Sequence, residues 1–240
     1  MLPLKDDNPT RVFPFVTVLL ILANVLAFLY EAFGGSSGAQ LTVSSLGLIP
    51  SELVHGVDAP PHSPIPLFLT PFTSMFLHAS WLHLGGNMLY LWIFGNNVEE
   101  AFGVFRFLLF YLFSGLIAAL THVVTAPYST VPVIGASGAV AGVLGAYAVL
   151  YPHARVLTLV PLFIFIRLAW LPALLILGVW FLLQILEGIP TLGAASDAGG
   201  VAFFAHIGGF ITGILCGLAF KRRTRRFPRA HLNLPFDEFQ

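Results

Sequence analysis

The chain has 240 residues, of which 57% are hydrophobic and only 9% are charged, and its formal net charge is zero. Soluble globular proteins carry about 25% charged residues, so this chain has too few ionised groups to cover a water-facing surface. With a mean hydropathy of +0.88, the composition excludes an ordinary soluble enzyme, a disordered protein and a nucleic-acid-binding domain. It indicates a protein whose solvent is lipid. The single cysteine, Cys216, allows no internal disulfide.

Six apolar stretches are candidates for membrane-spanning helices, because a helical span needs about 20 mostly apolar residues. In chain order they cover residues 13–33, 71–94, 101–124, 134–151, 168–186 and 201–220. The first is longer than the apolar region of a cleaved signal peptide, so we expect it to be retained. The apolar stretch 156–166 is too short to span a bilayer, and we interpret it as an interfacial or loop segment.

These spans predict an all-α, polytopic membrane protein with six transmembrane helices. We expect a single membrane domain over residues 1–240, with its spans between about 13 and 220 and a basic cytoplasmic tail at 221–240. The connection 34–70 is the one long loop and is rich in Gly, Ser and Pro. A loop of this length usually has packed structure of its own.

The positions of the basic residues predict the orientation. In a six-span arrangement all eleven fall on one side of the membrane: Lys5, Arg11, Arg106, Arg155, Arg167, Lys221, Arg222, Arg223, Arg225, Arg226 and Arg229. The connections and the adjoining span ends on the other side carry acidic residues instead: Glu31, Glu52, Asp58, Glu187 and Asp197. Since Lys and Arg are retained on the cytoplasmic side, both termini are expected in the cytoplasm. We interpret the cluster at 221–226 as a topological signal rather than a lipid-binding patch, because it directly follows a span.

Polar side chains at membrane depth are costly, and they are therefore candidates for function. Within the six spans they are Asn24, His78, His83, Asn87, Arg106, His122, Ser137, Gln184 and His206. No Asp or Glu occupies the centre of a span, so the usual signature of a proton-coupled transporter is missing. His83 and Asn87 are four residues apart and share one helix face, with His78 about a turn before them. A lone histidine of this kind is more often a structural hydrogen-bonding group.

Ser137 lies at the start of the fourth predicted helix, between small residues. The soluble-hydrolase turn requires Gly two residues after the serine, and that position is Ala139. A serine here is often only a cap or a packing residue. However, the free backbone N–H groups and the dipole at a helix N-terminus favour an oxyanion.

The sixth predicted helix carries His206 followed by a stripe of Gly209, Gly213 and Gly217, which lets a neighbouring helix approach closely. The fourth helix has small residues of its own, so the two helices can pack backbone to backbone. This packing would bring Ser137 and His206 within hydrogen-bonding distance, although it is equally compatible with a purely structural role.

In combination these motifs resemble those of the rhomboid intramembrane serine proteases. The matching segments, in the right order and over most of the chain, are His78-x4-His83-x3-Asn87, Gly95-Asn96-Asn97-Val98-Glu99, Gly135-Ala136-Ser137-Gly138 and Ala205-His206-x2-Gly209. The resemblance implies a six-helix rhomboid-like bundle that needs no metal or cofactor. It also implies cleavage of single-span or membrane-anchored proteins at small-residue sites in or near the bilayer. Membrane lipid is then the environment, nucleic acid is not a partner, and we expect a multi-pass protein of a bacterial inner membrane.

The resemblance also implies roles for individual residues. Ser137 would be the nucleophile and His206 the general base, in a dyad that opens to the external side. His83 and Asn87 would stabilise the oxyanion together with the Ser137 N–H. The remaining motif residues would support the site: Gly135, Gly138, Gly209 and His78. The sequence departs from the family pattern at two places. The loop 34–70 lacks the Trp-Arg pair of many bacterial members, and Ala141 occupies a position where some members have an aromatic residue that stacks on the histidine. The second leaves open what orients the His206 ring.

The fifth predicted helix is our candidate for a gate, since a substrate helix must reach a buried dyad from lipid. It lacks a glycine stripe, carrying only Gly178, and Trp180 and Phe181 are placed near its outer end by the predicted boundaries. We expect these two side chains to close a gap in the side of the bundle by packing alone.

Two other classes of function compete with a protease. A non-catalytic rhomboid-like binder of membrane clients would be favoured by loss of the serine or the histidine, and both are present. A metal or solute transporter could use His83, Asn87 and His206, but no Asp, Glu or Cys ligand joins them.

Overall fold

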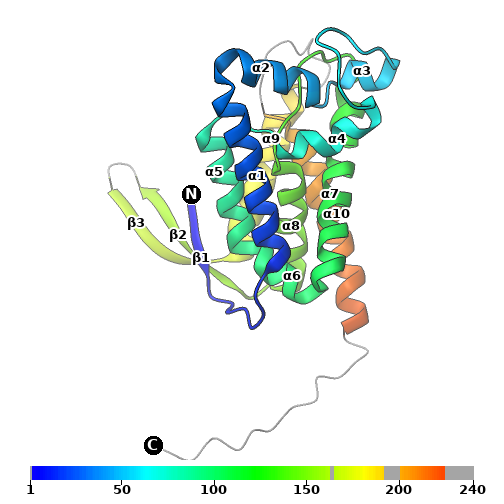
Figure 1. Ribbon diagram of the computed structural model, residues 1–240. Helices are drawn as coiled ribbons and strands as arrows, with labels where there is room; N and C mark the ends of the chain where they lie inside the picture. The colour runs from blue at the N-terminus through cyan, green and yellow to red at the C-terminus, as the bar shows by residue number, and fades with distance from the viewer. Residues whose placement is uncertain (1, 163–164, 192–200, 225–240) are drawn as a thin grey trace, which may run out of the picture.

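The computed structural model describes residues 2–162, 165–191 and 201–224. It is a bundle of helices with a small antiparallel sheet to one side (Figure 1). Asp197 and the part of the predicted basic tail beyond Thr224 lie outside the described residues.

Four of the described helices are long and apolar enough to cross a membrane. They are α1 (Phe15–Phe33), α7 (Val104–Thr125), α9 (Ala173–Gly188), which continues as a 3-10 turn (Ile189–Thr191), and α10 (Phe203–Thr224). They correspond to the first, third, fifth and sixth predicted spans, and the predominantly helical membrane fold is confirmed. The second and fourth predicted spans form shorter helices, so the count of six crossings stays a prediction.

The second predicted span, 71–94, is broken into several elements. They are α4 (Thr70–Thr73), a 3-10 turn (Ser74–Phe76), α5 (Trp81–Tyr90), a π-helical turn (Leu91–Gly95) and α6 (Asn96–Phe102). The extended backbone of Leu77 ends the first part, and Ser80 caps α5 by accepting the His83 N–H at 3.1 Å. Because α5 begins only at Trp81, His83 lies in its first turn rather than deep in a long helix.

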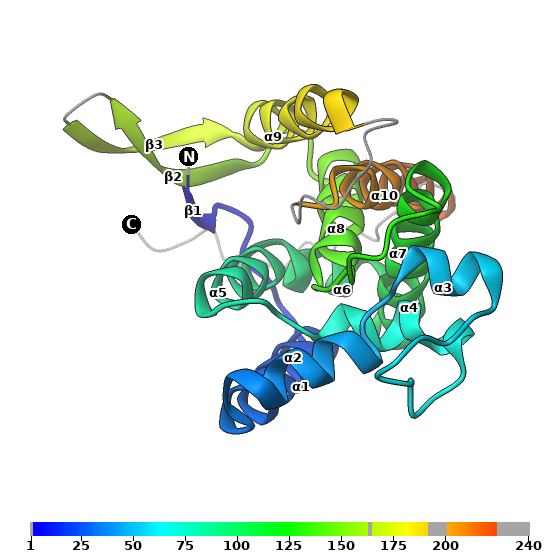
Figure 2. The same cartoon turned by 90° about the horizontal axis from the view of Figure 1, so that it is seen from above.

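Helix α8 (Ser137–Leu150) occupies the centre of the bundle, enclosed by α5, α7, α9 and α10 (Figure 2). Its residues from Gly138 to Tyr147 are all buried. At 1.5 Å per residue this helix is about 21 Å long, less than the roughly 30 Å hydrocarbon thickness of a bilayer. The helix is therefore a core element that carries Ser137 at its N-terminus.

The glycine stripe of α10 faces α8. A Cβ atom at Gly209 would overlap the carbonyl oxygen of Gly138, and a Cβ atom at Gly213 would overlap that of Gly142. The two backbones are thus in direct contact, and no larger residue fits without moving a helix. This contact sets the separation between α8 and α10.

The long loop between α1 and α4 is structured, as expected from its length. It forms α2 (Gly35–Leu46), α3 (Pro50–His55) and a 3-10 turn (Leu67–Leu69), all at the upper end of the bundle in Figure 1. Leu48 in this loop is fully buried and forms an isolated β-bridge with Val133. The bridge ties the loop to the segment that leads into Ser137.

The sheet was not expected from hydropathy. Its strands are β1 (Leu2–Asp6), β2 (Arg155–Leu162) and β3 (Phe165–Pro172), in the order β1-β2-β3 and antiparallel throughout. The stretch 156–166, interpreted as a loop segment, therefore lies in a hairpin, and α9 starts at Ala173 instead of residue 168. Apolar runs of this length are equally compatible with strand and helix, and the many branched and aromatic residues favour the strands.

The carboxylates of Glu99 and Asp6 fasten the N-terminal segment to the bundle. Glu99 accepts the Val16 and Thr17 N–H groups at 2.9 and 2.8 Å, which caps α1 at its positive end. Asp6 accepts hydrogen bonds from Tyr147 Oη at 2.6 Å and Asn97 Nδ2 at 2.9 Å, and burial raises the pKa of its carboxyl group. The N-terminus is thereby held at the end of α8 opposite Ser137.

Candidate active site

Ser137 is presented by a turn that only glycine can make. Gly135 has φ +119°, a conformation that residues with a Cβ rarely adopt. A Cβ atom there would also lie 2.7 Å from His83 Cε1. The Gly135 N–H donates to the Ser74 carbonyl at 2.8 Å, which anchors the turn. The chain then enters α8 with the half-buried Ser137 as its first residue.

Ser137 and His206 are in hydrogen-bonding contact, with 2.7 Å between Ser137 Oγ and His206 Nε2. His206 belongs to the first turn of α10 and is only 8% exposed. The direct contact of α8 and α10 carries the two side chains together, as the sequence predicted for their packing.

The second nitrogen of His206 bonds to Gln184, a residue to which the sequence motifs give no role. Gln184 Oε1 on α9 lies 2.7 Å from His206 Nδ1, and the Gln184 side chain is 7% exposed. The Trp180 ring, also on α9, lies 5.7 Å from the His206 ring, centroid to centroid. The sequence signal was a lone glutamine within an otherwise apolar span, which implies a buried partner.

His83 faces the Gly135–Ser137 turn from α5. Its Nδ1 accepts the Ala79 N–H at 3.4 Å, so the proton of the neutral ring is on Nε2. Asn87 donates to the His83 carbonyl at 3.1 Å. His78 is 2% exposed and packs edge-on against His83, with 5.0 Å between ring centroids. His78 thus supports His83, while His83 and Asn87 lie near Ser137.

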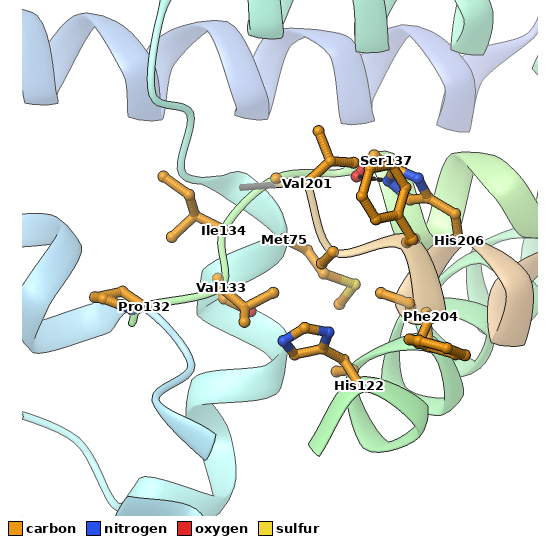
Figure 3. Close-up of a pocket in the computed structure, with 18 of the residues that line it drawn as sticks. Met75, His122, Pro132, Val133, Ile134, Ser137, Val201, Phe204 and His206 are labelled. Carbon is orange, nitrogen blue, oxygen red and sulfur yellow. Dashed lines mark hydrogen bonds between the residues drawn. The ribbon is translucent and has the colours of Figure 1, made fainter. Parts of the chain in front are cut away.

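Two cavities meet at the Ser137–His206 pair. The larger has a volume of about 730 Å³, and Figure 3 shows Ser137 and His206 on one side of it and His122 on the other. The smaller has a volume of about 230 Å³ and is lined by His83, Asn87 and Trp180 as well as by the pair. The serine hydroxyl is therefore accessible from two directions.

The two gate candidates differ in their surroundings. Because α9 starts at Ala173, both lie near its middle and not near its outer end. Trp180 lines the smaller cavity, whereas Phe181 stacks on Phe210 of α10 at 4.5 Å between ring centroids. Their role as a gate stays a prediction.

Among the described residues there is no group of three or more His, Cys, Asp or Glu side chains that could hold a metal ion. The polar groups near the pair include imidazoles, the amides of Asn87 and Gln184, and backbone N–H groups. Such groups can activate a hydroxyl and bind an oxyanion.

A family model described as the rhomboid domain matches residues 68–223, a region that contains Ser137, His206, His83 and Asn87. The chain belongs to the rhomboid family. It is an integral membrane protein, with four helices in the described residues able to span a bilayer. The single membrane domain over residues 1–240 stays a prediction.

Several known proteins are similar in sequence to this rhomboid. Rhomboid protein 1, mitochondrial, from Saccharomyces cerevisiae is 34% identical over 65% of this chain and 44% of its own length. Rhomboid protease GluP from Bacillus subtilis is 32% identical over 59% of this chain and 25% of its own. Rhomboid-like protein 11, chloroplastic, from Arabidopsis thaliana is 34% identical over 60% and 49%. The chain thus spans less than half the length of these relatives.

Proposed function

We propose that this rhomboid is an intramembrane serine endopeptidase that cleaves single-span or membrane-anchored proteins. The observation that carries the proposal is the 2.7 Å contact between Ser137 Oγ and His206 Nε2 at the start of a buried helix. The relative from Bacillus subtilis is named a rhomboid protease, which supports the same reaction class.

In the proposed reaction, Ser137 Oγ attacks the carbonyl carbon of the scissile peptide bond while His206 Nε2 takes the hydroxyl proton. The tetrahedral intermediate collapses, the C–N bond breaks, and His206 returns the proton to the leaving amine. Water then attacks the acyl-enzyme while His206 takes its proton. The bond to Ser137 Oγ breaks, the acid product leaves, and His206 returns the proton to Ser137 Oγ. No metal or cofactor enters this sequence.

The developing oxyanion is stabilised by donors around the Gly135–Ser137 turn. These are the Ser137 N–H at the N-terminus of α8 and the Nε2–H of His83. Asn87 lines the same small cavity, and its amide must leave the His83 carbonyl to reach the oxyanion. We therefore assign Asn87 the secondary part of this role.

The proposed orientation puts both termini in the cytoplasm and the dyad toward the external side. Lys5, Arg11 and Arg155 belong to segments held at the end of the bundle opposite Ser137, consistent with the positive-inside rule. The bacterial inner membrane stays a prediction, since the similar proteins include ones named as mitochondrial and chloroplastic.

The test uses the purified protein in liposomes with a panel of single-span membrane proteins. Wild type should cleave at least one of them, and Ser137→Ala and His206→Ala should each reduce cleavage to background while remaining folded, because nucleophile and base act as a unit. A fluorophosphonate should label wild type at Ser137. Cleavage and labelling that persist in Ser137→Ala would refute the proposal, and a folded wild type that never cleaves or labels would favour the client binder.

A further inference from the structure

We propose that Gln184 is a positioning residue that fixes the tautomer and the orientation of the His206 ring. The inference rests on the proposed function, since it concerns how His206 acts as base. The geometry that carries it is a continuous chain from α9 to α8: Gln184 Oε1 to His206 Nδ1 at 2.7 Å, then His206 Nε2 to Ser137 Oγ at 2.7 Å.

The orientation of the Gln184 amide determines where the His206 proton lies. The Gln184 amide nitrogen is directed at the Trp180 carbonyl one turn earlier, at 3.5 Å, which leaves Oε1 facing His206. An amide oxygen only accepts hydrogen bonds, so His206 Nδ1 must carry the proton of the neutral ring. His206 Nε2 is then unprotonated and able to accept from Ser137.

The opposite tautomer would disable the pair. With the proton on Nε2, His206 would have no lone pair toward Ser137 and could not remove the hydroxyl proton. In serine hydrolases a third group usually selects the productive tautomer, and that group is typically a carboxylate. The other histidines that line the larger cavity are His83 on α5 and His122 on α7, whereas the group bonded to His206 Nδ1 is Gln184. Gln184 therefore supplies the acceptor in this chain.

Burial makes the contact effective. The Gln184 and His206 side chains are 7% and 8% exposed, so water cannot replace the acceptor freely. The Trp180 ring lies along the His206 ring at an interplanar angle of 36° and limits its rotation. One turn of α9 thus bonds the His206 ring at its edge through Gln184 and packs against its face through Trp180. Trp180 takes the place of the aromatic residue that some family members have at the position of Ala141.

Gln184 does not line either of the two cavities at the dyad. A substitution there should therefore change turnover and leave substrate binding unaltered. Gln184→Met keeps the length of the side chain and removes the acceptor, so we expect kcat to fall about tenfold with KM within about twofold, the effect of one lost buried hydrogen bond. Gln184→Glu keeps an oxygen acceptor in place, and it should retain at least the wild-type kcat. The matched control is Leu183→Met on the lipid-facing side of α9, where the side chain is 46% exposed.

A spectroscopic readout separates positioning from stability and from the proposed function. In protein labelled with ¹⁵N-histidine, with His206 assigned by its loss in His206→Ala, wild type and Gln184→Glu should show a protonated Nδ1 and an unprotonated Nε2. Gln184→Met should lose this pattern. A protonated Nε2 in wild type, or wild-type kcat and an unchanged spectrum in Gln184→Met, would overturn the inference. Absence of cleavage by wild type would refute the proposed function alone, because the tautomer is measured without substrate.

Discussion

The contact between α8 and α10 allows a severe test, because the distance between Ser137 and His206 depends on it. Gly213→Ala lies nearly two turns from His206, and its new methyl group would overlap the Gly142 carbonyl oxygen. Ordinary van der Waals contact begins near 3.4 Å, so the helices must separate by at least about 1 Å. The bond of 2.7 Å between Ser137 and His206 would then lengthen to about 3.7 Å, beyond hydrogen-bonding range.

We expect Gly213→Ala to lose about 100-fold in kcat, the usual cost of a misplacement of about 1 Å. Overpacking should also lower the free energy of unfolding by about 1–3 kcal/mol. The assay is the initial rate of cleavage in liposomes, with thermal unfolding measured on the same preparation. The control is Gly178→Ala on α9, where a Cβ atom meets nothing within 4 Å and both quantities should stay near wild type. Equal activity in the two variants would show that the helix contact does not set the catalytic distance.

Two further predictions concern the surroundings of Ser137. Asn87→Ala should reduce kcat by about 100-fold or less, since the other oxyanion donors remain, and the double change with His83→Ala should reduce kcat more than either change alone. A folded Asn87→Ala protein as inactive as Ser137→Ala would contradict this arrangement. Trp180→Ala with Phe181→Ala should lower the melting temperature and speed cleavage of transmembrane substrates, with little change for a soluble peptide. Because Trp180 also packs on His206, Phe181→Ala alone is the cleaner gate test, and a lower melting temperature without faster cleavage would argue against α9 as the gate.

The residues of the candidate site could be predicted because their signals are local. A serine between small residues at a helix start and a histidine that precedes a glycine stripe both stand out in apolar spans. The position of His83 along its helix could not be predicted in the same way, because residues 71–80 are apolar enough to be interpreted as part of that helix. The break there depends on the cap at Ser80 and the extended Leu77, to which hydropathy is insensitive.

Gln184 could not be predicted from the sequence as the partner of His206, for a different reason. Gln184 contacts His206 only because α9 starts at Ala173 and presents one particular face to α10. The predicted start at residue 168 placed five residues of β3 in the helix, so the depth of every α9 side chain was shifted. Helix rotation and depth follow from packing between elements, which periodicity alone does not determine.

His206 on α10 is contacted by two other helices, α8 and α9, and this division affects which membrane proteins remain long enough to be cut. Ser137 and His206 stay together because α8 and α10 share a backbone contact, whereas α9 touches His206 through the side chains of Gln184 and Trp180. A protein that reaches the serine by displacing α9 would therefore remove the acceptor that keeps the base in its productive form. Cleavage would then be about tenfold slower until α9 returns behind the bound segment. Membrane proteins that only pass by would leave before that, and dwell time as well as sequence would decide which chains are cut.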